Sequence, residues 1–211
     1  MTQKQKHRLY IKMIAQFIEA KNLEGCFVEC GVKYGTTAIV MVKELKCKGF
    51  LFDTWCRFEG LSKIDGPPKM LNFVKKRNGR PIKKLCQQAL KKHGVEHLCK
   101  MIQGDARKTV VEWVKENGQT IKMIQLDMDV YEPTKVCLNL LWPYLHAKGM
   151  IFVHDYGSKK WKGIIKSVNE FNSEHPSVVV PYNDIKACLI SHKEIENETR
   201  QLVAICEQSS V

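Results

Sequence analysis

LDMDVYEPTK at residues 126–135 and VHDYG at 153–157 are the stretches that decide the fold. Each follows a short apolar run, at 122–126 and 150–153, and the intervening segment 132–145 has helical periodicity. This order predicts a strand, a crossover helix and a second, parallel strand. Ligands of parallel sheets bind at the carboxyl ends of the strands. The two polar clusters are therefore expected at one edge of the sheet.

This arrangement brings three acids and a histidine together. Asp127 ends the first strand, and His154 and Asp155 end the second, so the three side chains can share a divalent cation. Asp129 is expected on the same side as Asp127, free to act as a base beside the metal. An Asp after a strand is also commonly a turn residue or a helix N-cap. Capping needs one acid per helix, and this cluster holds more.

The rest of the chain alternates helices and strands. Along the whole chain, strands are expected at 26–31, 49–54, 99–105, 121–127 and 150–155, helices at 7–21, 36–47, 81–93, 107–117, 132–145 and from Trp161 to Phe171, and a hairpin around Asn183 and Asp184. Pro143 should kink the last turn of its helix. We predict an α/β fold in a single domain over 1–211, with a mostly parallel seven-stranded sheet, helices on both faces and a C-terminal antiparallel hairpin.

Three segments stand outside this alternation. Residues 1–23 form an amphipathic N-terminal helix, and no signal peptide is indicated. Residues 55–80 are polar and too long for an ordinary connection, so we expect a lid or binding loop. The tail at 193–211 has no role that the sequence identifies.

The composition is that of a globular protein, with 44% hydrophobic and 27% charged residues. No apolar run approaches the roughly 18 residues of a membrane span. The nine cysteines are scattered without a CxxC pair, which favours reduced thiols in a cytoplasmic protein and gives none of them a catalytic role.

The net charge of +12 is unevenly placed. Between residues 69 and 100, ten basic residues stand against Glu96 alone. Such a patch can attract RNA, a nucleotide-linked substrate or an acidic glycan. The alternative is a solvated lysine face that keeps the protein soluble.

Other polar residues also end predicted strands. Glu29 and Gly31 lie at the end of the strand at 26–31, Asp53 at the end of 49–54 and Asp105 at the end of 99–105. The GxGxxG dinucleotide fingerprint is not met, but Gly31 would let a ligand approach the backbone closely. Asp53 sits where an acid can accept hydrogen bonds from ribose hydroxyls. Gly104 and Asp105 can equally form a turn, and Glu29 can be a helix-cap partner.

With these strand-end residues, the chain resembles the class I S-adenosylmethionine-dependent methyltransferases, which have a Rossmann-like fold. More narrowly, it resembles the macrocin O-methyltransferase (TylF-like) family of sugar O-methyltransferases, from about residue 24 to 192. The resemblance rests on GCFVECGVKYGTTA, FDTWCRFEGL, QGDARKT, LDMDVYEPTK, and VHDYG followed by KGIIKSVNEF. The LDMDVYEPTK block with DYG downstream is the specific part; the others are shared more loosely.

The resemblance implies a role for each strand-end residue. Glu29 and Gly31 would border the methionine moiety of S-adenosylmethionine, Asp53 would hold the ribose, and Asp105 would lie beside the adenine. Asp127, His154 and Asp155 would be the metal ligands and Asp129 the general base. The family usually has a second aspartate in place of His154, and an imidazole tilts metal preference from Mg²⁺ toward Mn²⁺ or Zn²⁺.

The expected function is therefore divalent-metal-dependent O-methylation of a sugar or glycan acceptor. Trp55 and Phe58 of the lid are candidates to stack on the sugar ring, and Trp55 can equally pack in the core. One alternative is an RNA 2'-O-methyltransferase, which salt-sensitive RNA binding would favour; another is a non-catalytic binding protein that keeps the fold. Neither a membrane nor a nucleic acid is the expected partner. The sequence leaves open a homo-oligomer and the identity of the sugar and its hydroxyl.

Overall fold

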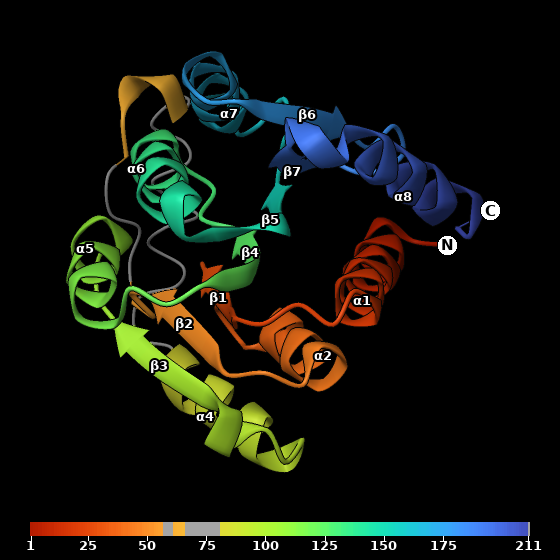
Figure 1. Ribbon diagram of the computed structural model, residues 1–211. Helices are drawn as coiled ribbons and strands as arrows, with labels where there is room; N and C mark the ends of the chain where they lie inside the picture. The colour runs from red at the N-terminus through yellow and green to blue at the C-terminus, as the bar shows by residue number, and fades with distance from the viewer. Residues whose placement is uncertain (57–60, 66–80, 211) are drawn as a thin grey trace.

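A seven-stranded sheet in the order β3-β2-β1-β4-β5-β7-β6 forms the centre of the protein (Figure 1). The computed structural model describes residues 1–56, 61–65 and 81–210. The five strands from β3 to β5 pair in parallel, and β7 pairs antiparallel with both β5 and β6. The predicted fold class, including the C-terminal hairpin, is confirmed. The strands are β1 (Cys26–Cys30), β2 (Gly49–Asp53), β3 (Cys99–Gln103), β4 (Ile121–Leu126), β5 (Leu145–His154), β6 (Ser177–Pro181) and β7 (Ala187–His192).

Helices cover both faces of the sheet. They are α1 (Gln3–Ala20), α2 (Thr36–Leu45), α4 (Ile82–Lys92), α5 (Ala106–Asn117), α6 (Tyr131–Leu141), α7 (Lys162–Glu174) and α8 (Glu196–Gln208), with short 3-10 turns η1 (Lys63–Asp65), η2 (Glu96–Leu98), η3 (Trp142–Tyr144) and η4 (Lys193–Ile195). Helices α5, α6 and α7 lie on one face, and α1, α2 and α8 lie on the other (Figure 1).

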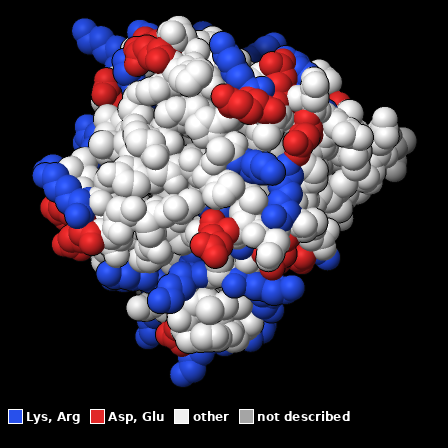
Figure 2. Space-filling model, in the orientation of Figure 1, with Lys and Arg blue, Asp and Glu red and all other residues white. Residues whose placement is uncertain are grey.

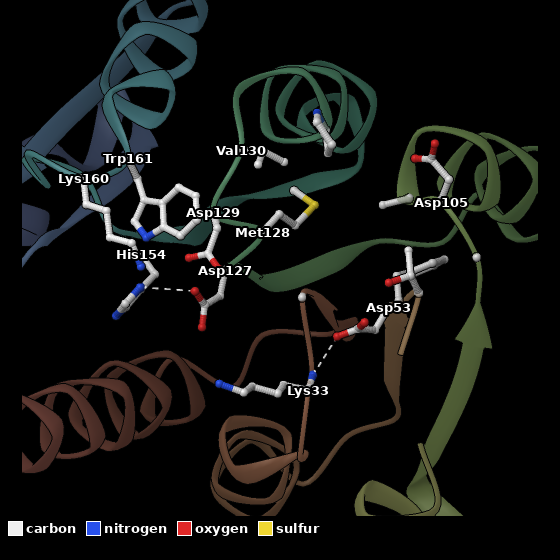
Figure 3. Close-up of a pocket in the computed structure, with 16 residues that line it drawn as sticks. Lys33, Asp53, Asp105, Asp127, Met128, Asp129, Val130, His154, Lys160 and Trp161 are labelled. Carbon is white, nitrogen blue, oxygen red and sulfur yellow. Dashed lines mark hydrogen bonds and ion pairs between the residues drawn. The ribbon is translucent and has the colours of Figure 1, made fainter. Parts of the chain in front are cut away.

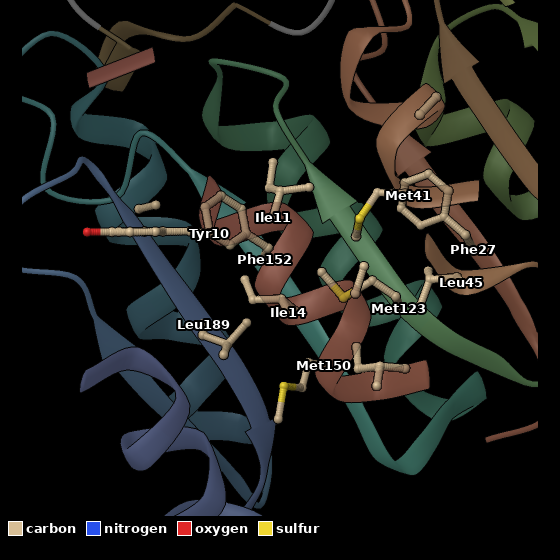
Figure 4. Packing of buried hydrophobic residues seen from close by; sticks show 14 of the residues in the cluster. Tyr10, Ile11, Ile14, Phe27, Met41, Leu45, Met123, Met150, Phe152 and Leu189 are labelled. Atoms are coloured by element: carbon tan, nitrogen blue, oxygen red, sulfur yellow. The ribbon is translucent and has the colours of Figure 1, made fainter. Parts of the chain in front are cut away.

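Alternation along the strands divides the core in two. Phe27, Met123 and Phe152 point toward α1 and α2, while Val28, Ile124 and Ile151 point toward α5, α6 and α7. Figure 4 shows Ile11 and Ile14 of α1 among the side chains of the first layer. Burying a side chain of this size contributes about 1.5–3 kcal/mol. The two layers hold the sheet rigidly, so the strand ends have fixed positions.

Some element boundaries differ from the predicted ones. Helix α1 begins at Gln3 because Thr2 and Gln5 form a reciprocal capping box that the sequence analysis overlooked. Strand β5 begins at Leu145, five residues earlier than predicted. Leu145 pairs with Ile121 of β4, and the register of the two strands shifts between Ile121 and Met123. Pro143 lies in the 3-10 turn that follows α6, so the α-helix ends at Leu141 instead of kinking.

The C-terminal tail is part of the domain. Helix α8 packs against β7, β6 and α1. Tyr10 of α1 donates a hydrogen bond to Asp184 Oδ2 at 2.5 Å, and Ser210 donates to the same oxygen at 3.0 Å. Residues 193–210 of the tail that the sequence left without a role therefore help to hold the N-terminal helix on the sheet.

Most of the predicted lid, including Phe58, lies outside the described residues. Trp55 is buried in the core, 4% exposed, and its indole N–H donates to the Lys33 carbonyl at 3.0 Å. It is therefore not available to stack on a sugar. Asp65 accepts a hydrogen bond from the Tyr131 N–H at 2.6 Å, so the described end of this segment is attached to the start of α6.

The basic stretch is only partly within the described residues. Lys84, Lys91, Lys92 and Lys100 are exposed, Lys83 is half-buried, and Lys69, Lys75, Lys76, Arg77 and Arg80 lie outside the description. Figure 2 shows Lys and Arg side chains around the lower part of the molecule, where α4 lies in Figure 1. None of the described helices is long and apolar enough to cross a membrane. All nine cysteines are free thiols.

Candidate active site

A cleft of about 260 Å³ opens at the carboxyl ends of the parallel strands (Figure 3). Six of the eight predicted site residues line it: Gly31, Asp53, Asp105, Asp127, Asp129 and His154. Asp155 lies beside His154, and Glu29 is buried beneath the cleft. The strand-end argument therefore predicted which parts of the chain lie together at this edge of the sheet.

Gly31 allows β1 and β4 to approach each other at this edge. It has φ +93°, and a Cβ atom there would lie 2.1 Å from the Asp127 carbonyl oxygen. The Asp127 N–H donates to the Cys30 carbonyl at 2.9 Å. A side chain at position 31 would force these strand ends apart.

Asp53 is held by the backbone on both sides. One carboxylate oxygen accepts the Lys33 N–H at 2.7 Å, and the other accepts the Trp55 N–H at 2.6 Å. Both donors belong to residues with positive φ, so the carboxylate holds the two loops that follow β1 and β2. Its orientation is thus set before any ligand binds.

Asp105 caps α5. Its carboxylate accepts the Arg107 N–H at 3.0 Å and forms a two-pronged contact with the Arg107 guanidinium. The Arg107 guanidinium holds the pKa of Asp105 below its usual range. The capping role, which was the alternative for a strand-end Asp, is realised at this residue, and the side chain still lines the cleft.

Two buried polar residues, Glu29 and Gln125, lie below the cleft. They are register partners on β1 and β4, with 2% and 0% exposure. The Glu29 carboxyl accepts the Ala38 N–H in the first turn of α2, as the helix-cap alternative supposed, and burial raises its pKa well above the usual value. Glu29 Oε2 and both amide atoms of Gln125 have no hydrogen-bond partner in the described chain.

Asp127, His154 and Asp155 meet at one point. Their donor atoms lie within 4.8 Å of one another. His154 Nδ1 is 3.1 Å from Asp127 Oδ1 and 3.1 Å from Asp155 Oδ2. Among the described residues, Nδ1 is not aligned with either oxygen as a hydrogen bond. Two carboxylates and one imidazole nitrogen that face a common point are a donor set that fits Mn²⁺ or Zn²⁺.

The charges within this cluster shift the pKa values of His154 and Asp127. Burial lowers the pKa of His154, but Asp127 and Asp155 outweigh that effect and raise the pKa to about 11. Burial likewise raises the pKa of Asp127, yet the charge of His154 lowers it overall. Without a metal, the histidine is therefore an imidazolium between two carboxylates.

His7 of α1 packs against this cluster, a contact that no sequence signal indicated. Its ring is 4.6 Å from the His154 ring in an edge-on arrangement, with the two positions 147 residues apart in sequence. Burial, with the nearby charge of His154, lowers the pKa of His7 to about 4. His7 is therefore neutral at pH 7.

Unusual backbone conformations concentrate at this edge. Lys33, Trp55, Asp129 and Asp155 all have positive φ, between +49° and +67°. Non-glycine residues adopt this region at a cost of about 1–3 kcal/mol and cluster at functional sites. Asp129 reaches the cleft because of this turn, and not by the strand alternation that the sequence analysis assumed.

Lys33, Lys160 and Trp161 also line the cleft, although the sequence analysis did not select them. Lys33 follows the end of β1, so the strand-end rule could have found it. Lys160 and Trp161 lie beyond the DYG segment in the loop before α7. Their position depends on how that loop folds back over the sheet.

Comparison with known proteins agrees with this geometry. The family described as "Methyltransferase domain" matches residues 28–156, more than half of the 211-residue chain. A comparison with curated protein sequences finds no match.

Several solved structures share the fold. The calicheamicin methyltransferase CalS11 superposes with a TM-score of 0.69 at 21% identity, covering 86% of this chain and 77% of that one. The O-methyltransferase NovP gives 0.72 at 16% identity, covering 89% and 79%. An O-methyltransferase from Bacillus cereus in complex with SAH gives 0.60 at 9% identity, covering 90% and 80%. The chain is thus a member of the methyltransferase-domain family, with the class I fold of S-adenosylmethionine-dependent O-methyltransferases.

Proposed function

We propose that this methyltransferase moves the methyl group of S-adenosylmethionine to a sugar hydroxyl, with a divalent cation at Asp127, His154 and Asp155. The proposal rests on one observation above all. The three donor atoms face a common point in the cleft of a methyltransferase domain, and Asp129 lines the same cleft. This narrower assignment is also that of the macrocin O-methyltransferase resemblance.

The cofactor would occupy the Asp53 and Asp105 side of the cleft. Asp53 would accept hydrogen bonds from the ribose, Asp105 would lie beside the adenine, and Gly31 and Glu29 would border the methionine part. The B. cereus neighbour with bound SAH supports this cofactor. Each carboxylate keeps free lone pairs after its protein contacts, so a ligand can be added without breaking them.

The metal site would serve the acceptor. A divalent cation bound there would lower the pKa of the sugar hydroxyl and fix its orientation. Asp127 and Asp155 supply two anionic oxygens, and His154 supplies a nitrogen in its neutral form, so its proton must leave when metal binds.

Asp129 would accept the hydroxyl proton. The methyl carbon forms its bond to the sugar oxygen as the carbon–sulfur bond breaks, and the electron pair of that bond stays on sulfur. A general base contributes about 10²–10⁴ to the rate of such a step. Positioning of the two reactants in the cleft would supply much of the remainder.

A sugar acceptor is supported by one of the structural neighbours. CalS11 is described as a TDP-rhamnose 3'-O-methyltransferase; that structure has a TM-score of 0.57 and 20% identity to this chain. RNA also offers a hydroxyl acceptor, the 2'-hydroxyl of its ribose. The test therefore includes both sugars and RNA.

The test measures cofactor binding and methyl transfer separately. Calorimetry should show binding of SAH, and labelled S-adenosylmethionine should methylate a sugar from a panel that also contains RNA. Excess EDTA should abolish transfer, and Mn²⁺ should restore it at least as well as Mg²⁺. Absence of SAH binding would overturn the methyltransferase assignment. Undiminished activity in excess EDTA would overturn the metal, and methylation of RNA alone would overturn the sugar.

A further inference from the structure

The carboxylate of Asp65 lies where two helices begin. Figure 1 shows η1 close to α6 and α7, and η1 contacts α7. Asp65 Oδ1 accepts the N–H of Tyr131, the first residue of α6, at 2.6 Å. A Cβ atom at Gly163, in the first turn of α7, would lie only 2.2 Å from the same oxygen. Because Gly163 has no side chain, the carboxylate fits between the two helix starts.

Neither helix is capped by the residue that precedes it. Val130 precedes α6 and Trp161 precedes α7, and within the described chain neither side chain makes a cap hydrogen bond. Valine is among the poorest N-cap residues. The partial positive charge of a helix N-terminus attracts a carboxylate. Asp65 therefore supplies, from 66 positions away in the sequence, the cap that α6 lacks locally.

Asp65 is itself fixed on its other side. Its exposure is 2%, and Oδ2 accepts the N–H of Ser62 at 2.9 Å and the Ser62 hydroxyl at 2.8 Å. A buried carboxylate needs hydrogen-bond donors in place of water. Together with the Tyr131 N–H, three donors point at this carboxylate. They hold the Asp65 side chain in one orientation, and the start of α6 is held with it.

The bond to Tyr131 fixes one end of the turn that carries Asp129. At the start of this turn, the Asp127 N–H donates to the Cys30 carbonyl of β1 at 2.9 Å. At its end, the Tyr131 N–H donates to Asp65. Between these two points Asp129 has φ +67° and lines the cleft. Non-glycine residues in this left-handed region are strained and persist where their surroundings fix them. The bonds at both ends of the turn supply such fixation.

We propose that Asp65 is a positioning residue for methyl transfer: its carboxylate holds the start of α6 and thereby keeps Asp129 in the cleft. The inference rests on the proposed function, in which Asp129 accepts the hydroxyl proton. Asp65 is not among the described residues that line the cleft, so its effect on the reaction passes through the turn at 127–131. Misplacement of a reacting group by about 1 Å can lower a rate by about 10²-fold.

Amide hydrogen exchange tests this anchor without cofactor, metal or acceptor. In the parent, the Tyr131 amide should be protected, because it donates to a buried carboxylate. Asp65→Ala should speed its exchange about 10-fold or more relative to the amides of β4, since a charge-assisted hydrogen bond is lost. Ser62→Ala removes only a hydroxyl contact to the other oxygen and should leave Tyr131 protected. Unchanged exchange of Tyr131 in Asp65→Ala would overturn the proposal.

A double-variant cycle separates positioning from a merely structural role. With a sugar that the parent methylates, Asp65→Ala should lower kcat about 10-fold or more and leave the dissociation constant of SAH unchanged. In an Asp129→Asn background the same change should cost nothing further, because Asp65 acts through Asp129. An equal loss of kcat in both backgrounds would overturn the proposal. Asp65→Asn keeps the shape of the side chain and takes the place of Asp65→Ala in the cycle if that variant does not fold.

Thr199→Val is the control for lost stability. Thr199 is buried on α8, where its hydroxyl lies 2.7 Å from the Ser191 hydroxyl, and α8 packs on β6, β7 and α1. This variant should unfold at lower urea concentration and keep the parental kcat. An equal fall in kcat would mean that lost stability explains Asp65→Ala, against the proposal. Failure of the proposed function is seen separately, as absent SAH binding, and parental turnover of Asp129→Asn would overturn both.

Discussion

The two ends of the cleft hold their carboxylates in different ways. At the end proposed for the cofactor, Asp53 accepts two backbone N–H groups and Asp105 is tied to Arg107. At the end proposed for the metal, Asp127 and Asp155 face the ring of His154. The first end is preorganised by hydrogen bonds within the protein, and the second by mutual attraction of charges. A ligand that adds to the first end finds its partners oriented; a cation at the second must displace a proton.

The largest expected effect is at Asp129, which lines the cleft and is the base of the proposed reaction. Asp129→Asn should lower turnover by about 10²-fold or more, because the amide cannot accept the hydroxyl proton. Asn tolerates the left-handed backbone at this position, φ +67°, so the fold should persist. SAH calorimetry and initial rates with saturating acceptor check this expectation.

Glu116→Gln, an exposed acid near the end of α5, is the matched control for charge removal and should keep parental activity. A loss of SAH binding in Asp129→Asn would instead assign Asp129 to the cofactor end. Near-parental turnover would remove it from the role of base.

The next effect concerns the preorganised end. Asp53→Ala should weaken SAH binding by roughly 10-fold or more and lower the free energy of unfolding by about 1–3 kcal/mol, because two backbone N–H groups lose their acceptor. Asp53→Asn keeps one oxygen and should fall between the parent and Ala. Calorimetry and urea unfolding measure both quantities. An affinity loss without a stability loss would mean that the two loops do not depend on this carboxylate.

A smaller effect is expected in the pH dependence of the metal end. The folded-state pKa of His154 is raised from 6.5 to about 11, so its stabilisation is complete below pH 6.5 and is lost as the pH rises toward 11. His7 has the opposite sign: its pKa is lowered to about 4, so its contribution is present above pH 6.5 and is lost as the pH falls toward 4. Stability in EDTA should therefore be highest near pH 6.5.

Thermal unfolding of the parent and His154→Gln between pH 5 and 8.5 tests this expectation. The parent should lose stability above pH 6.5, and the variant should show a flatter alkaline side. Cysteines of the unfolded chain begin to titrate within this range, but they do so in both proteins, so the difference between parent and variant reports the histidine. An equal alkaline slope in both proteins would mean that the histidine is not held as an imidazolium.

The smallest effect is expected below the cleft. Gln125→Met should raise the free energy of unfolding by about 1 kcal/mol, because it replaces a buried amide without protein partners by an apolar side chain of similar size. Met123→Leu, two residues earlier on the same buried strand, is the control and should give no such gain. Urea unfolding of the parent and both variants measures these changes in the free energy of unfolding. Destabilisation by Gln125→Met would indicate that bound water links the amide to Glu29.

Local sequence patterns were sufficient to predict the helices and strands, and to predict the edge of the sheet at which the candidate site lies. Apolar runs followed by Asp127, Asp53 and His154 predicted strands, and parallel strands must end at a common edge. The predictions failed where one local signal was overlooked, as in the capping box at Thr2, or where a strand extends beyond its apolar run, as at Leu145.

The state of each side chain was beyond prediction because it depends on contacts distant in sequence. Asp53 is fixed by Lys33, twenty positions away, and His154 is covered by His7 from the other end of the chain. Lys33 and Lys160 line the same cleft although 127 positions separate them in the sequence. No periodicity relates positions so far apart.

The sequence by itself determined the order of helices and strands and the carboxyl edge that gathers Asp53, Asp105, Asp127 and His154, because side-chain periodicity and parallel pairing are local rules. Tertiary structure alone decided which of these groups is already bonded, which backbone turns are left-handed and which lysines line the cleft. Those properties arise from burial and from charges that only the folded chain brings within a few ångströms of one another.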